Sequence, residues 1–370
     1  MKHLYLFLSS VMLLMATVCR ADDKPELRYV DASEFRIINK GWDNTFETYT
    51  RVPAYMKDSL RDNQWWLYTH SAGIAIRFAT NSTRIGAHYN IRYNFHMQHM
   101  AMTGIKGTDL YMLNHKGKWE YVNTARPQEK NYKTDSIQSK VYVENLDGEM
   151  HEFMIYLPLY DGINWLQIGV DSNAILQQPR TDNPRRKRIV FYGTSILQGG
   201  CASRTGMVPT AIIQRDLNIE CVNLATSGEG KLDYCMARLM ATIDDVACFV
   251  LDPVPNCTEM MCDTLTYGFV KILRTLRPDV PIVMVEGLMY PYAKHDSYFR
   301  DYLPRKNAAW HRNYLRLKKE NPKQLYYVTC DGFSGRDEEG TVDGVHLTDY
   351  GFRAYADKLE PVLKKAIRRK

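Results

Sequence analysis

Short apolar stretches recur through the first half of the chain, from about Leu27 to Gln177. β-Branched and aromatic residues dominate them, and turn-forming pairs such as Asp147-Gly148 and Asp161-Gly162 separate them. We predict strands at 74–78, 84–91, 110–113, 119–122, 140–143, 152–157 and 165–170. Many short strands at this spacing are typical of a β-sandwich or jelly roll. No helical periodicity of comparable strength interrupts them.

The pattern changes after a polar stretch at 177–185, beyond which apolar runs alternate with segments of helical period. We predict strands at 189–192, 220–224, 248–251, 282–286 and 325–328, and helices at 210–217, 232–243, 265–277, 298–320 and 350–368. This alternation indicates a parallel sheet covered on both faces, with a site at the carboxyl ends of its strands. The predicted domains are an N-terminal β domain (22–178), a linker and start of the first strand (179–188), and an α/β domain (189–370).

The first residues have the composition of an export signal. Lys2 and His3 precede an apolar run from Leu4 to Val18, and the small Ala21 offers a cleavage point. We predict a signal peptide at 1–21 and a secreted or periplasmic protein, with lipoprotein anchoring at Cys19 as an alternative. No later stretch approaches the ~20 apolar residues that a membrane helix needs.

Composition adds two limits to the function. The net charge of +6 includes Lys2 and Arg20, so about +4 remains without the predicted signal peptide, which is too mild to indicate nucleic-acid binding. The basic runs at 185–188 and 364–370 suit a linker and a chain terminus. Of the eight cysteines, all but Cys19 lie in the C-terminal half, without the paired spacing of a zinc site. We expect buried thiols, and a Cys257–Cys262 disulfide stays open as an alternative.

One serine stands at the turn that follows the first strand of the α/β domain. The segment 192–200 reads Tyr-Gly-Thr-Ser-Ile-Leu-Gln-Gly-Gly, which places Ser195 between small residues at a strand-to-helix turn. A catalytic nucleophile needs this kind of exposure, with backbone N–H groups near it to bind an oxyanion. By itself the motif also suits a plain turn between a strand and a helix.

Residues later in the chain supply the groups that such a serine needs. His346 can act as its base, and Asp343, three residues earlier, can orient the imidazole. Candidate oxyanion donors are the backbone N–H groups of Ser195 and Gly228 and the side chain of Asn256, each of which follows a predicted strand.

These residues form blocks that resemble the SGNH (GDSL-like) hydrolases. The blocks occur in the family's order: Gly193-Thr194-Ser195-Ile196, Asn223 to Gly228, Pro255-Asn256 and Asp343-x-x-His346. The longer strings at 192–204 and 340–346 resemble a subgroup, known chiefly from exported bacterial proteins, in which an N-terminal β domain precedes the hydrolase domain. The resemblance thus covers nearly all of the mature chain. Thr194 and Ala225 depart from the wider family's Asp and Gly, and neither departure touches the triad.

The resemblance implies a flavodoxin-like αβα hydrolase with a five-stranded parallel sheet. It implies a nucleophile, a base and two oxyanion donors at Ser195, His346, Gly228 and Asn256, with Asp343 completing the triad. It also implies that no metal or other cofactor is needed, and that the substrates are esters, often acetyl groups on sugars.

We therefore expect an exported serine esterase that removes O-acetyl or other short acyl groups from carbohydrate through an acyl-enzyme. The substrate is a small or polymeric acylated carbohydrate, and the β domain is expected to flank the cleft. Lipid esters or thioesters are an alternative substrate class. A carbohydrate-binding protein with an inactive hydrolase domain is an alternative of another kind, which the intact triad argues against. Arg204, close after the nucleophile turn, could contact substrate or pair with a surface carboxylate.

Two further groups of side chains suggest ligand binding. His96 and His99 suggest a metal site, but on a strand they would face opposite ways, and neither has a nearby cysteine or acidic partner in the sequence, so we predict no metal. Trp65-Trp66 and Trp119 could stack on sugar rings, although packing in the core of the sandwich is the expected use.

Overall fold

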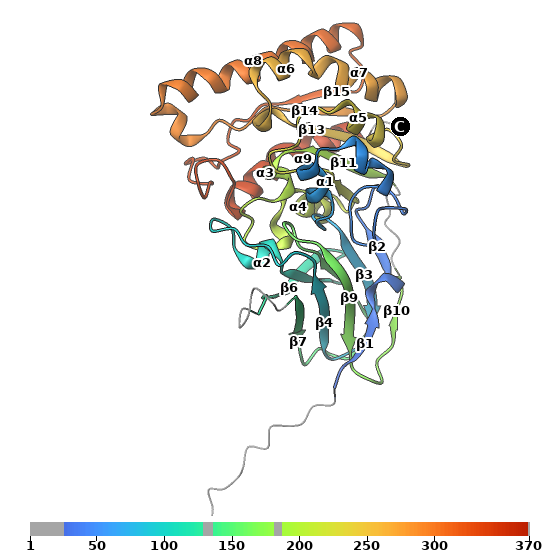
Figure 1. The fold of residues 1–370 in the computed structure, drawn as a ribbon. Coiled ribbons are helices and arrows are strands. Elements are labelled where there is room, and N and C mark those ends of the chain that lie inside the picture. Colours follow the sequence, from blue (N-terminus) through green and yellow to red (C-terminus); the bar gives the residue numbers. More distant parts are fainter. Residues whose placement is uncertain (1–25, 129–135, 181–186, 369–370) are drawn as a thin grey trace, which may run out of the picture.

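A computed structural model describes residues 26–128, 136–180 and 187–368 (Figure 1). The predicted signal peptide at 1–21, including Cys19, and most of the predicted linker lie outside the described residues. Within the described ranges, no helix combines the length and the apolar character that crossing a membrane requires.

The N-terminal half contains two antiparallel sheets. The first has the order β1-β9-β4-β7, with strands Arg28–Asp31, Ile163–Val170, Ile85–Ile91 and Ile137–Val143. The second has the order β10-β3-β8-β5-β6, with strands Leu176–Gln177, Ala75–Thr80, His151–Tyr156, Thr108–Leu113 and Trp119–Ala125, and β2 (Arg36–Ile38) pairs with β3. Every strand predicted in this half is present. The sequence did not reveal the short β1, β2 and β10, because two to four residues give too little alternation to detect.

The two sheets enclose one apolar core. Ala87 and Ile168 from the first sheet share it with Phe78 and Phe153 from the second, and all four are fully buried. The rings of Phe78 and Phe153 stack across neighbouring strands with centroids 5.6 Å apart. A two-sheet β-sandwich is therefore confirmed, while its finer assignment as a jelly roll stays a prediction.

The C-terminal half is built on a five-stranded parallel sheet of order β12-β11-β13-β14-β15. Its strands are Cys221–Asn223, Arg188–Gly193, Val246–Asp252, Ile282–Val285 and Leu325–Val328. Numbered within the domain, this is the order 2-1-3-4-5 of flavodoxin-like folds, in which ligands bind where the strand order reverses, beside the first strand. The predicted fold class is confirmed.

Helices cover both faces of this sheet. α4 (Pro209–Leu217) and α9 (Asp349–Ile367) pack on the face that presents Ile189 and Phe191. The opposite face, with Val190 and Tyr192, is covered by α5 (Tyr234–Met240), α7 (Thr266–Leu276) and α8 (Ser297–Glu320). The shorter helices are α3 (Ser195–Gln198) and α6 (Glu259–Thr264), with 3-10 turns η3 (Thr205–Met207), η4 (Val254–Asn256) and η5 (Pro291–Lys294).

A segment early in the chain packs on the parallel sheet of the C-terminal half instead of on the sandwich. It contains η2 (Ala54–Ser59) and α1 (Asp62–Tyr68), and Figure 1 shows α1 beside β11. Val52, Met56 and Tyr68 belong to the same core as Val190. The sequence analysis predicted no helix here, because seven residues rich in tryptophan and tyrosine carry a weak helical signal. The remaining short helices of this half are η1 (Ala32–Glu34) and α2 (Met102–Ile105).

Candidate active site

Ser195 begins α3 directly after β11. Thr194 caps this helix, and its Oγ1 accepts a hydrogen bond from the Ile196 N–H at 3.4 Å. A Cβ on Gly193 would lie 2.8 Å from the Asp252 carbonyl oxygen of the neighbouring strand, so the turn needs glycine there. Ser195 is 8% exposed, whereas Thr194 before it and Leu197 after it are fully buried.

Asp343 and His346 lie on one tight turn before α9. The Val342 N–H donates to the His346 carbonyl at 2.8 Å, and Gly344 adopts φ +85°, which glycine tolerates best. Asp343 Oδ1 accepts from the backbone N–H groups of Val345 (3.0 Å) and His346 (2.8 Å). The other oxygen, Oδ2, lies 2.7 Å from His346 Nδ1. The spacing seen in the sequence thus places carboxylate and imidazole in one hydrogen-bonded pair.

The turn presents the second ring nitrogen of His346 to Ser195. His346 Nε2 lies 2.9 Å from Ser195 Oγ. With Nδ1–H donating to Asp343, Nε2 is left to accept the proton of the serine hydroxyl. Partial burial raises the pKa of Asp343, but hydrogen bonds from the His346 ring and from two backbone N–H groups outweigh it and lower that pKa to about 2. The carboxylate therefore stays ionised and holds the ring in the tautomer that a general base needs.

Gly228 and Asn256 lie together beside this triad. The carboxamide of Asn256 lies against the Gly228 loop: its Nδ2 donates to the Thr226 carbonyl at 3.3 Å, and the amide group comes within 3.3 Å of the Gly228 backbone nitrogen. Gly228 has φ +68°, and a Cβ there would point into open space. Gly230, by contrast, approaches the Gly193 carbonyl so closely that a Cβ would clash. Gly230 therefore has a packing role, whereas Gly228 borders open space.

The Gly228 loop is tied to the nucleophile turn. Asn223 Nδ2 donates to the Leu197 carbonyl at 2.7 Å, and the Ser227 N–H donates to Gln198 Oε1 at 2.8 Å. The Thr226 N–H donates to the Gly193 carbonyl at 3.1 Å. These bonds fix the position of the predicted donor Gly228 relative to Ser195.

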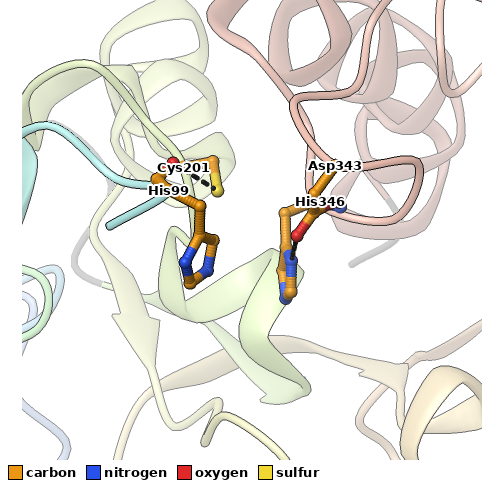
Figure 2. A group of neighbouring side chains, drawn as sticks. All are labelled: His99, Cys201, Asp343 and His346. Carbon is orange, nitrogen blue, oxygen red and sulfur yellow. Dashed lines mark hydrogen bonds and ion pairs between the residues drawn. The ribbon is translucent and has the colours of Figure 1, made fainter. Parts of the chain in front are cut away.

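The β domain contributes His99 to the same place (Figure 2). Its ring centroid lies 5.6 Å from that of His346, and Cys201 Sγ donates to the His99 carbonyl at 3.4 Å. His96 and His99 lie in the loop between β4 and α2, so placing them on a strand was wrong. The sequence analysis did single out His99 as a possible ligand. It could not find the neighbours of His99, because Cys201 and His346 belong to the other domain and reach it only when the two domains dock.

A buried carboxylate holds the loop that carries His99. Asp161 is fully buried and accepts from the backbone N–H groups of Tyr93 (2.8 Å) and Phe95 (2.7 Å). Burial raises the pKa of Asp161 to about 6 against these hydrogen bonds. Lys106, also buried, donates to the Asn94 side chain.

Arg204 binds the protein itself. Its guanidinium donates to Asp109 Oδ2 and to the Tyr111 hydroxyl, both at 2.7 Å, and lies 3.8 Å from the Tyr121 ring centroid. Of the two uses expected for Arg204, the ion pair is the one seen, but Asp109 is fully buried in the β domain and not a surface carboxylate. We therefore leave Arg204 out of the proposed substrate site.

Cys201 is the other reactive side chain near the triad. Burial, with a smaller contribution from the charge of Asp343, raises the pKa of its thiol to about 12. The thiol is therefore protonated at neutral pH and does not compete with Ser195 as a nucleophile. The described cysteines, Cys257 and Cys262 among them, are all free.

The tryptophans considered for sugar stacking pack against the protein. Trp65 lies against the core of the parallel sheet, and Trp66 contacts the rings of His70 and Phe95. Trp119 packs against the core shared by the two domains, under the guanidinium of Arg77. Packing is thus their observed use, although most of it lies at the domain boundary and not inside the sandwich.

Two family models match successive parts of the chain. The model described as "GDSL-like Lipase/Acylhydrolase family" matches residues 186–364, and "N-terminus of Esterase_SGNH_hydro-type" matches residues 27–176. Comparison with curated proteins gives no match.

Solved structures give a strong likeness over nearly the whole chain. A Bacteroides ovatus structure assigned to the GDSL-like lipases is 35% identical, with a TM-score of 0.86, and the alignment covers 93% of this chain and 99% of that one. The salicylyl-acyltransferase SsfX3 of a tetracycline biosynthetic pathway is 15% identical, with a TM-score of 0.67 and coverages of 85% and 89%. A family two carbohydrate esterase from Clostridium thermocellum, in complex with cellohexaose, is 13% identical, with a TM-score of 0.57 and coverages of 80% and 93%. At 15% and 13% identity, the likeness to the acyltransferase and to the carbohydrate esterase shows a shared fold alone.

Proposed function

We propose that this chain, which belongs to the GDSL-like lipase/acylhydrolase (SGNH) family, is an exported serine esterase that removes short acyl groups, acetyl first, from carbohydrate. The observation that carries the proposal is the continuous hydrogen-bonded chain from Asp343 through His346 to Ser195, with links of 2.7 and 2.9 Å. The leader-like residues 1–21 support export.

In the proposed reaction, His346 Nε2 takes the proton of Ser195 as its Oγ attacks the ester carbonyl. The negative charge that forms on the carbonyl oxygen is bound by the N–H groups of Ser195 and Gly228 and by the Asn256 amide. The imidazolium, stabilised by Asp343, then protonates the leaving alcohol. Water, activated by the same imidazole, releases the acyl group from Ser195.

Two observations support a carbohydrate substrate. A protein of the same fold is a carbohydrate esterase. In this chain, Tyr292 lies against Gly344 of the catalytic turn and stacks on Tyr290, so aromatic side chains lie close to the triad. Aromatic rings with a polar edge suit sugar rings, which have both apolar faces and hydroxyl groups.

The test compares hydrolysis of p-nitrophenyl acetate, butyrate and octanoate by the wild type, Ser195→Ala and Ser297→Ala. Ser297 is exposed at the start of α8 and serves as the matched control. We expect acetate to be preferred, and Ser195→Ala to lose about 10⁴–10⁶ in kcat while Ser297→Ala keeps its activity. Preference for octanoate would move the assignment to lipid esters. Equal activity in all three proteins would refute Ser195 as the nucleophile.

The substrate class is then tested with acetylated oligosaccharides and polymers, by measuring acetate release. Release that depends on Ser195 is expected. Activity on p-nitrophenyl acetate without release from any acetylated glycan would contradict the carbohydrate assignment and leave the esterase assignment intact.

A further inference from the structure

Four metal-ligating side chains from three parts of the chain meet beside the nucleophile: His99, Cys201, Asp343 and His346. We call them the His–Cys–Asp–His cluster. We propose that this cluster binds a zinc ion, and that the bound ion reversibly inhibits the esterase by occupying the catalytic His346–Asp343 pair. The inhibition rests on the proposed function, whereas the binding of the ion does not.

The geometry of the cluster is close to that of a zinc site. One ligand atom from each residue can be chosen so that all lie within 4.8 Å of one another. Ligand atoms around a tetrahedral zinc ion are roughly 3.3–3.6 Å apart, given bonds of about 2.0–2.3 Å. The more distant ligand atoms must therefore approach one another by about 1 Å, while the hydrogen-bonded pair of Asp343 Oδ2 and His346 Nδ1, 2.7 Å apart, must open, and side-chain rotations provide both movements. The exposed His99 is the freest of the four to move.

The cluster is held in place from several directions. Asp161 fixes the loop that carries His99, and the catalytic turn fixes Asp343 and His346. Cys201 adopts φ +74° just after the nucleophile helix, where its Sγ already contacts the His99 carbonyl. Figure 2 shows His99 and Cys201 on one side and the His346–Asp343 pair on the other.

The ligand types favour zinc over the hard cations. One thiolate, two imidazoles and one carboxylate form a borderline-soft set typical of Zn²⁺, whereas Mg²⁺ and Ca²⁺ prefer oxygen ligands. On binding, the Cys201 thiol loses its proton to solvent as the sulfur–zinc bond forms. The sequence-based prediction of no metal rested on His96 and His99 facing opposite ways on a strand and on the lack of a nearby cysteine or carboxylate. The structure places both histidines in a loop and brings Cys201 and Asp343 to His99.

An ion bound here removes the groups on which the proposed reaction depends. His346 is then a ligand and no longer a base for Ser195, and Asp343 no longer orients it. Ser195 is not a ligand. Metal binding and hydrolysis can therefore be measured separately, because Ser195→Ala should lose hydrolysis and keep the metal.

The first experiment titrates chelator-treated protein with Co²⁺ as a spectroscopic substitute for Zn²⁺. For the wild type and for Ser195→Ala we expect the visible bands of tetrahedral Co²⁺ and a thiolate-to-cobalt charge-transfer band, both displaced by Zn²⁺. Cys201→Ala should lose the charge-transfer band. Cys235→Ala, which removes a partly exposed thiol elsewhere, should keep it. Absence of the charge-transfer band in the wild type would overturn the proposal.

The second experiment measures inhibition of p-nitrophenyl acetate hydrolysis by Zn²⁺, each variant being compared with its own metal-free rate. His99→Ala and Cys201→Ala should raise the apparent inhibition constant at least about tenfold. His96→Ala, three residues away in the same loop, should leave it unchanged. Equal inhibition of all variants would place the ion elsewhere and refute the site. A chain with no esterase activity but with the cysteine-dependent Co²⁺ spectrum would refute the proposed function and keep the site.

Discussion

The carboxamide of Asn256 lies against the Gly228 loop, within 3.3 Å of its backbone N–H groups. Its proposed role is to stabilise the oxyanion, which exists only in the transition state and the intermediates. Asn256→Ala is therefore expected to lower kcat by about 10²–10³ and to change KM little. Steady-state kinetics with p-nitrophenyl acetate, beside circular dichroism to confirm folding, measures this.

Asn164 provides the matched control for that substitution. It is exposed on β9 of the sandwich, where its Nδ2 donates to Asn90 Oδ1 at 2.6 Å. Asn164→Ala should keep wild-type kcat. Near-normal turnover of Asn256→Ala would show that Asn256 does not bind the oxyanion.

The hydrogen bonds to Asp343 also predict a pH dependence of stability. Its pKa is about 2 in the folded protein, against 3.8 for an ordinary aspartate. A lowered pKa means that the ionised carboxylate stabilises the fold above pH 3.8 and that this contribution is lost as the pH falls toward 2. Because the side chain is 34% exposed, we expect only about 1 kcal/mol after solvent screening.

Urea unfolding of the wild type and Asp343→Asn at several pH values tests this. The variant should be less stable at neutral pH, and the difference should shrink in acid as the wild-type carboxylate takes up its proton. A difference that does not change with pH would mean that the hydrogen bonds to Asp343 do not favour its ionised form.

Among single residues, the sequence predicted a site role for those whose partners are close along the chain or belong to a recurring motif. Asp343 and His346 are three residues apart, and the turn that joins them is local. The environment of His99 was beyond sequence reasoning, because Cys201 is about a hundred residues away and reaches it only through docking of the domains.

Among the elements, the ion pair between Arg204 and Asp109 links β5 of the sandwich to the loop after the nucleophile helix. Burial raises the pKa of Asp109, and the nearby Arg204 opposes this. Asp109 also accepts from the Gly206 N–H at 2.8 Å. Arg204→Met leaves a buried carboxylate without its cation, so we expect a loss of about 3–5 kcal/mol in the free energy of unfolding, measured in urea.

The exposed pair of Arg305 and Glu259 is the control for this loss. Its N–O distance is 3.0 Å, but both side chains face solvent. Arg305→Met should cost less than about 1 kcal/mol. Equal losses in Arg204→Met and Arg305→Met would show that burial of Asp109 does not make its ion pair more important.

The elements themselves were largely predictable. The strands of the parallel sheet are buried on both faces and form apolar runs, and the long helices carry a clear period. The sequence analysis did not predict α1, because this short helix has little intrinsic helical stability. Contacts of Trp65 and Tyr68 with the core of the hydrolase sheet stabilise it instead.

Across the whole molecule, the N-terminal half completes the hydrolase half. Arg51 is buried and donates to the carbonyls of Asn223 (3.0 Å) and Ala225 (2.7 Å), in the segment that leads to Gly228. Met56 and Tyr68 fill the core beneath β11. The sequence analysis expected the β domain to flank the cleft, and the structure gives it the further role of covering one part of the hydrolase core.

We therefore expect that residues 187–370 alone do not form a stable domain. Removing the N-terminal half exposes the surface around Val190 that Met56 and Tyr68 cover, and it leaves the Asn223 and Ala225 carbonyls without the Arg51 guanidinium. The fragment should aggregate or lack a cooperative thermal transition, whereas residues 22–370 should unfold cooperatively. Co-expression of residues 22–180 should restore solubility and esterase activity. A soluble 187–370 fragment with wild-type kcat on p-nitrophenyl acetate would show that the hydrolase fold is complete without these contacts, and the N-terminal half would then act on substrate binding alone.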